Sequence, residues 1–236
     1  YFGNPLGVKP VLFNLLSAFH REQAEVLVVR RNSGTIFDKK TDEELHAMLG
    51  DHCSIIDTTP ENVPKLFEFL ISEYIPKVIV PHRNAYCEQN GIPDTDKGRT
   101  IKAAKYIRSK TKPLFVLFES FADLVAADKE GTFASVFNML KGFNIYFAGC
   151  FYPNDESMTT NNIFRSFAKE DLAFLFGGQF HKAWLTSIPS DIKRMEKINP
   201  NYNRFVMKYR SECHRMIMPC GQLITADADP DEQEII

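Results

Sequence analysis

The chain has 236 residues, and its 28 Lys and Arg against 30 Asp and Glu give a formal net charge of −2. A length of this order predicts one large domain, and 44% hydrophobic with 25% charged residues excludes an intrinsically disordered chain. The balanced charge argues against a surface built for nucleic-acid phosphates. Five cysteines without a CxxC pair argue against a disulfide framework. No apolar run of about 20 residues is present, so we expect no membrane insertion by this stretch of chain.

Strands and helices are expected to alternate along most of the chain. Short apolar runs predict strands at 25–30, 54–57, 114–118, 144–150 and 173–176, and a strand-like end through 205–223. Helical spacing of apolar residues predicts helices at 11–19, 41–49, 60–89, 100–112, from 119 to about 141, 164–172 and 190–198. This order predicts an α/β fold with a mostly parallel sheet flanked by helices.

Several local features refine this expectation. Pro76 and Pro81 are predicted to kink or break the long helix, because proline lacks an amide donor. The turn-rich stretch 90–98 (NGIPDTDKG) is the candidate mobile loop. We expect a single domain over 1–226, followed by an acidic C-terminal tail at 227–236 (DADPDEQEII).

The first loop resembles a phosphate-binding loop whose working residues are replaced. The phosphate loop GxxxxGK[ST] wraps phosphates with glycine amides, a lysine and a Mg²⁺-binding hydroxyl. Aligning it on Lys9 places Gly3 at the first glycine, but Val8 at the second and Pro10 at the hydroxyl position. Valine resists positive φ, and proline removes both an amide donor and the hydroxyl. The loop therefore predicts weak ATP and Mg²⁺ binding at most, or no cofactor.

Two later motifs extend this resemblance. The apolar strand LFVLF leads into Glu119 and Ser120 within ESFADL, which resembles the DEFADL motif of the FtsK/SpoIIIE family of hexameric motors. In that family an Asp holds Mg²⁺ and the following Glu activates water; Glu119 and Ser120 stand at those positions. The stretch 142–153 (GFNIYFAGCFYP) resembles the family's sensor strand, with Gly149 and Cys150 in place of its polar pair.

The resemblance implies a RecA-like P-loop NTPase fold with vestigial catalytic positions. Missing motor chemistry on a preserved skeleton is most similar to the last ATPase module of EssC-type coupling proteins of type VII secretion. That group implies protein recognition and regulation of export with little or no ATP hydrolysis. It also implies exported substrate proteins and neighbouring ATPase modules as partners, in the cytoplasmic part of a larger membrane-anchored bacterial protein.

Other functions stay open from the sequence. The chain could be an active ATPase motor in protein secretion or DNA translocation, although Ser120 supplies no catalytic carboxylate. DNA is an unlikely partner, because basic residues concentrate only at 102–112, where a solvated helix face is the simpler interpretation. A small-molecule enzyme on the same fold is the remaining alternative. No GxSxG, HExxH or GxGxxG motif supports it, and the six histidines are scattered.

The sequence contains two adjacent His and Cys pairs and one aromatic stretch that are candidates for metal and partner sites. His52–Cys53 and Cys213–His214 are adjacent pairs, and neighbouring side chains on a strand point to opposite faces, so no metal site is predicted. The stretch 174–185 (FLFGGQFHKAWL) combines two glycines with aromatic residues. Such a composition suits a groove for an apolar helix, and it makes Phe180 and Trp184 the candidate partner-binding residues.

Overall fold

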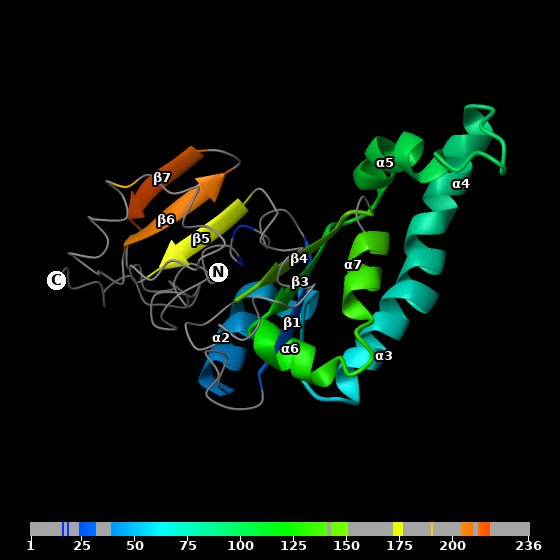
Figure 1. The fold of residues 1–236 in the computed structure, drawn as a ribbon. Coiled ribbons are helices and arrows are strands. Elements are labelled where there is room, and N and C mark those ends of the chain that lie inside the picture. Colours follow the sequence, from blue (N-terminus) through cyan, green and yellow to red (C-terminus); the bar gives the residue numbers. More distant parts are fainter. Residues whose placement is uncertain are drawn as a thin grey trace.

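The computed structural model describes residues 24–31, 39–140, 143–150, 172–176, 204–209 and 212–217, together with Leu16, Ala18 and Ser190. The predicted phosphate loop, the candidate groove residues and the acidic segment 227–236 lie outside the described residues. The described elements alternate between strands and helices up to residue 149 (Figure 1).

The predicted parallel sheet is confirmed. Its described strands are β1 (Glu25–Arg30), β2 (Cys53–Asp57), β3 (Leu114–Phe118) and β4 (Ile145–Gly149), in the order β2-β1-β3-β4. All neighbouring strands pair in parallel, with Val29 opposite Phe118 and Phe118 opposite Gly149. Parallel strands share one direction, so the ends of all four strands meet along one side of the sheet, which we call the carboxyl edge.

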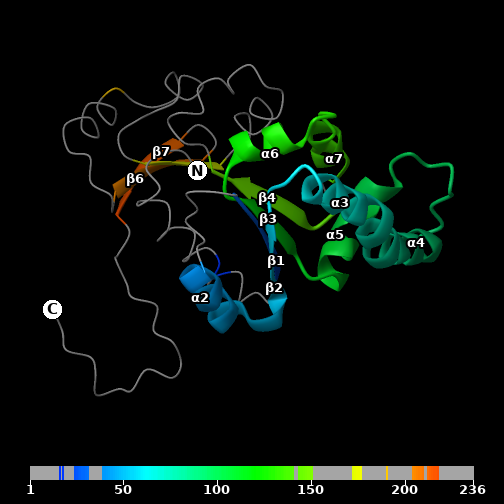
Figure 2. The ribbon, with the colours of Figure 1, turned by 90° about the horizontal axis from the view of Figure 1, so that it is seen from below.

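Helices cover both faces of this sheet (Figures 1 and 2). They are α2 (Lys39–Leu49), α3 (Asn62–Glu68), the π-helix η2 (Phe69–Ile79), α4 (Val80–Gln89), α5 (Arg99–Lys110), α6 (Phe121–Ala127) and α7 (Phe133–Leu140), with a 3₁₀ turn at η1 (Gly50–His52). On the face under α3, α6 and α7, the core is aromatic. The Phe133 ring lies edge-on to Phe118 with 5.3 Å between centroids, and 5.4 Å from Phe67. Edge-to-face packing is favourable for aromatic rings, so these rings join sheet and helices.

Of the predicted kink or break at the two prolines, the break does not occur. The helical run continues from Asn62 to Gln89 and changes its winding instead of ending. Pro76 lies inside the π-helix, and Pro81 stands in the first turn of α4. Backbone hydrogen bonds of a π-helix span one residue more than those of an α-helix, and this winding lets the helix continue past Pro76, whose nitrogen has no proton to donate.

The helical segment predicted after β3 is divided into two helices at Asp128. This buried carboxylate accepts hydrogen bonds from the backbone amides of Thr132 and Phe133, both at 2.9 Å. It also accepts one from the Thr132 hydroxyl at 2.8 Å. Asp128 therefore satisfies amide groups at the start of α7 that the helix itself leaves unpaired.

The predicted strand-like end forms part of a second sheet. The strands β5 (Leu172–Phe176), β6 (Arg204–Tyr209) and β7 (Glu212–Ile217) form an antiparallel sheet in that order. Only two residues connect β6 to β7, and so short a link permits antiparallel pairing alone. Among the described helices, none is long and apolar enough to cross a membrane.

Candidate functional site

The candidate site is the carboxyl edge of the parallel sheet, where the ESFADL motif leaves β3. Ligand sites of open α/β sheets lie outside this edge. Each strand here ends in or leads into polar or small residues: Arg30 in β1 and Arg31 after it, Asp57 in β2, Glu119 and Ser120 after β3, and Cys150 after β4. The described carboxylates at this edge each have a recorded partner.

Glu119 is held inside the sheet. The residue has no exposed surface, and its Oε2 accepts a hydrogen bond from the Arg31 amide at 2.9 Å. Its own amide donates to the Val29 carbonyl at 3.0 Å. The residue thus joins the end of β3 to the end of β1 through backbone and side chain together. A carboxylate in this position acts first as an acceptor that holds two strands.

Ser120 begins α6. Its backbone is extended, and its Oγ accepts a hydrogen bond from the Asp123 amide at 3.2 Å, an N-cap arrangement. The residue is 2% exposed. A hydroxyl used in this way satisfies an amide of the first helical turn and offers no general base. The hydrogen bond to the Asp123 amide makes Ser120 the N-cap of α6. That Ser120 takes no part in catalysis stays a prediction.

Two ion pairs were missed by the sequence interpretation. Arg31 Nε lies 3.4 Å from Asp123 Oδ2, and both side chains are about one-quarter to one-third exposed, at 27% and 30%. Arg30 Nε lies 2.8 Å from Asp57 Oδ1. Asp123 belongs to the FADL part of the quoted motif, and the double arginine directly after an apolar strand was a signal that could have been used. The pairs neutralise charge at the edge.

Phe121 packs directly on the end of β4. A Cβ placed on Gly149 would lie 1.9 Å from Cε2 of the Phe121 ring, far inside van der Waals contact. The Phe121 amide donates to the Cys150 carbonyl at 3.1 Å, and the Cys150 amide donates to the Phe118 carbonyl at 3.0 Å. Gly149 and Cys150 therefore serve close packing at the position where the resembling family has a polar pair.

At the described part of the edge, the carboxylates already have partners within the fold. No group of three His, Cys, Asp or Glu side chains suited to a metal ion occurs among the described residues. Glu119 is enclosed and joined to β1, while Asp57 and Asp123 face arginines. The predicted phosphate loop (Gly3, Val8, Lys9 and Pro10) and the predicted partner residues Phe180 and Trp184 lie outside the described residues.

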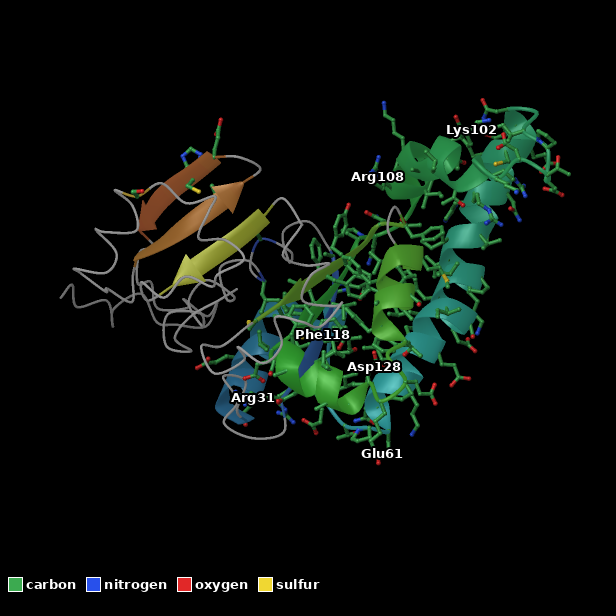
Figure 3. All side chains as sticks on the ribbon, in the orientation of Figure 1. Arg31, Glu61, Lys102, Arg108, Phe118 and Asp128 are labelled. Atoms are coloured by element: carbon green, nitrogen blue, oxygen red, sulfur yellow. The ribbon has the colours of Figure 1, made fainter. Side chains whose placement is uncertain are left out.

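The basic residues predicted on a helix face are on α5, far from the carboxyl edge (Figure 3). Together α4, residues 90–98 and α5 form a projecting arm, which we call the α4–α5 arm (Figure 1). Residues 90–98, predicted as a mobile loop, form hydrogen-bonded turns, and Asp96 Oδ1 accepts from the Gly98 amide at 2.7 Å. Asp96 also pairs with Lys102, and Asp94 Oδ1 lies 2.6 Å from Arg99 Nη1.

Hydrogen bonds from Lys102 and from the Gly98 amide lower the pKa of Asp96 below its usual range. A hydrogen bond to Cys87 and the nearby carboxylates of Asp94 and Asp96 raise the pKa of Arg99. Desolvation of the guanidinium acts in the opposite direction. Both groups are therefore held in their charged forms at the tip of the arm.

Three solved structures share this fold. The pCW3 conjugation coupling protein TcpA, determined as a monomer with ATPγS, has a TM-score of 0.55 and 16% identity. The cytoplasmic domain of EssC has a TM-score of 0.53 and 11% identity, and that of the type VII secretion ATPase EccC of Thermomonospora curvata has 0.58 and 14%. The alignments cover 89%, 92% and 92% of this chain.

These likenesses confirm the predicted α/β fold, which this chain shares with TcpA and with the cytoplasmic domains of EssC and EccC. The chain spans 56% of the TcpA chain, 39% of the EssC chain and 25% of the EccC chain. No family model and no curated protein matches the sequence.

Proposed function

We propose that the chain is a catalytically impaired FtsK/SpoIIIE-type module of a type VII secretion coupling protein. In this proposal it acts mainly in recognition of exported proteins and regulation of export, beside neighbouring ATPase modules of the same polypeptide. It belongs to the cytoplasmic part of a larger membrane-anchored bacterial protein. It binds ATP and Mg²⁺ weakly at most and hydrolyses little or no ATP.

The observation that carries this proposal is the use of Glu119 and Ser120 inside the fold. The Glu119 carboxylate accepts the Arg31 amide at 2.9 Å with no exposed surface, and Ser120 Oγ caps α6. A motor needs one carboxylate near Mg²⁺ and a second that activates water. Here the first position is occupied by a strand-joining acceptor and the second by a helix cap. Likeness to EssC and EccC supports the choice of secretion machinery.

Calorimetric titration of ATP·Mg²⁺ into the whole chain tests the nucleotide part. We expect a Kd no tighter than about 1 mM, equivalent to roughly −4 kcal/mol, and hydrolysis at background. Lys9→Ala should leave this weak signal unchanged, as should Lys65→Ala, a matched control at an exposed position of α3. Micromolar binding with turnover that Lys9→Ala removes and Lys65→Ala preserves would overturn the proposal.

An active ATPase is the second candidate, in protein secretion or DNA translocation. The TcpA structure that shares this fold was determined with ATPγS. Its nucleotide shows that a protein of this architecture holds an ATP analogue, which gives the second candidate a specific basis. The same titration separates the two candidates, because an active enzyme needs both tight binding and turnover that depends on Lys9.

Recognition of exported proteins is assigned in this proposal to Phe180 and Trp184. Tryptophan is over-represented among residues that dominate binding energy, and an apolar helix needs pockets at its own periodicity. The double change to Ala should abolish pull-down of an exported substrate while the melting temperature changes little. A fall in stability of about 3–5 kcal/mol would instead assign both aromatics to the core and remove this site.

A further inference from the structure

The α4–α5 arm carries an outward basic face that the proposed function does not use. On α5, Ile101, Lys105 and Arg108 follow one another at intervals of four and three residues, which places them on one side of the helix. All three are exposed, and Ile101 reaches 81%. Figure 3 places Lys102 near the tip of the arm and Arg108 closer to the sheet. The buried side of α5 consists of Ala103 and Ile107.

The recorded ion pairs of α5 lie near the tip of the arm. Arg99 pairs with Asp94 and Lys102 pairs with Asp96, while Lys110 lies 5.8 Å from the centre of the Tyr106 ring. No ion pair is recorded for Lys105 or Arg108 within the described part of the chain. The helix itself, RTIKAAKYIRSK, has five basic residues and no acidic one. Its outer face therefore keeps uncompensated positive charge.

The same sequence contains an acidic segment whose charge is complementary to that of α5. Residues 227–236 (DADPDEQEII) carry five acidic and no basic residues, and they end in two isoleucines. Its carboxylates complement Lys105 and Arg108, the α5 side chains without a recorded ion pair in the described part of the chain, and an isoleucine pair suits the exposed Ile101. Charge complementarity of this kind guides association and suppresses wrong partners. Outside α5 the sequence has 30 acidic and 23 basic residues, so a phosphate polymer would meet a less favourable net charge there than at the arm.

We propose that the basic face of α5 docks the acidic segment 227–236 of a second copy of this chain. A second copy is chosen because β7, which precedes the segment, and α5 lie on opposite sides of the parallel sheet in both views (Figures 1 and 2). The contact joins two different surfaces, so association is head-to-tail.

Two charge variants and their mixture test the proposal. The arm variant carries Lys105→Glu and Arg108→Glu; the segment variant replaces Asp227, Asp229, Asp231, Glu232 and Glu234 by Asn or Gln. Sedimentation velocity on the whole chain should show association that weakens as salt screens the charges. Each variant alone should associate at least tenfold more weakly. An equimolar mixture should associate again, because one copy keeps the segment and the other keeps the arm.

The control carries the same change of charge elsewhere. Lys65→Glu with Lys129→Glu alters two exposed lysines outside α5 and should associate like the unchanged chain. Circular dichroism melts show that each variant is folded before association is compared. Carbodiimide crosslinking of a mixture of isotopically labelled and unlabelled chains should join Lys105 to the segment between copies.

Four results would overturn the proposal. The first is a chain that stays monomeric up to about 1 mM at low salt. The second is association that the control reduces as much as the arm variant does. The third is crosslinks confined within single chains, which would place the segment on its own arm. The fourth is tight duplex-DNA binding that is lost in the arm variant, which would assign the basic face to phosphates.

Discussion

The carboxyl edge and the α4–α5 arm use charged residues in opposite ways. At the edge, Glu119 accepts a backbone amide with no exposed surface, and Arg31 pairs with Asp123 across two elements. On the arm, Lys105 and Arg108 stand exposed on a helix with no acidic residue of its own. Charge at the edge holds strands and helix starts together, whereas charge on the arm is accessible to a partner. This difference separates residues that maintain the fold from residues suited to recognition.

The carboxyl edge is also packed more tightly than the α4–α5 arm. At the edge, Phe121 is fully buried and meets Gly149 so closely that no Cβ fits. On the arm, α4 and α5 meet through the Tyr86–Tyr106 ring pair, whose centroids are 5.5 Å apart. Few residues there are buried: Cys87 on α4, and Ala103 and Ile107 on α5. We therefore expect substitutions at the edge to change global stability and substitutions on the outer face of the arm to change binding.

The largest effect is expected for Gly149→Ala. The new Cβ would collide with the Phe121 ring, which is itself fully enclosed, so the end of β4 or α6 must shift. Overpacking of a dense core costs about 1–3 kcal/mol and occasionally more, and we expect about 3 kcal/mol of lost unfolding free energy in urea denaturation. Gly98→Ala on the arm is the control: its Cβ meets the Asp96 side chain, which is 24% exposed, at 3.1 Å, and the loss should be much smaller. Equal losses at the two glycines would contradict the comparison.

The next effect separates the acceptor function of Glu119 from its charge. Glu119→Ala should lower the unfolding free energy by about 2–3 kcal/mol, because the Arg31 amide loses its acceptor and a space is left behind. Glu119→Gln keeps an oxygen that accepts the same hydrogen bond, and it should cost less than about 1 kcal/mol. Urea denaturation measures both variants. A Gln variant as damaging as the Ala variant would show that the negative charge itself is needed at this position.

Much of the parallel sheet could be predicted from the sequence. The run LFVLF lies exactly where β3 is found because a strand buried on both faces is a continuous apolar run. The long helix was harder, since Pro76 and Pro81 argue for a break when each is considered alone. A change to π winding around Pro76 and the position of Pro81 in the first turn of α4 depend on the neighbouring backbone. Sequence periodicity does not report that backbone.

The sequence predicted where the candidate site lies, but not the hydrogen bonds that its residues make. The ESFADL motif identified Glu119 and Ser120, and both lie at the carboxyl edge. Their hydrogen bonds depend on which strand lies beside β3, and the partner amide belongs to Arg31, 88 residues away in sequence. A tertiary contact of that separation leaves no local pattern. Asp128 was missed for a related reason, because its burial becomes apparent only when α6 and α7 are placed.

A smaller effect is expected at the start of α6. Ser120→Ala removes the N-cap of the Asp123 amide and should cost about 1 kcal/mol of unfolding free energy. Ser120→Thr keeps a hydroxyl acceptor at the same position and should restore most of this stability. If Ser120 is only a cap, the small ATP signal of the chain should be identical in both variants. A change in nucleotide turnover without a change in stability would give Ser120 a chemical role.

The smallest effect is a local pH dependence at the tip of the arm. Hydrogen bonds from Lys102 and the Gly98 amide lower the pKa of Asp96 in the fold, so the native arm favours the ionised carboxylate. The ionised Asp96 carboxylate therefore stabilises the folded arm at neutral pH. This stabilisation is lost as the pH falls through the lowered pKa, which lies below the ordinary range of aspartate. NMR titration should show the Gly98 amide signal following Asp96. Lys102→Met should raise the Asp96 pKa toward its ordinary value, whereas Lys77→Met, a control on the π-helix, should not. An Asp96 that titrates like a free aspartate in the unchanged chain would show that these turns do not hold the tip in solution.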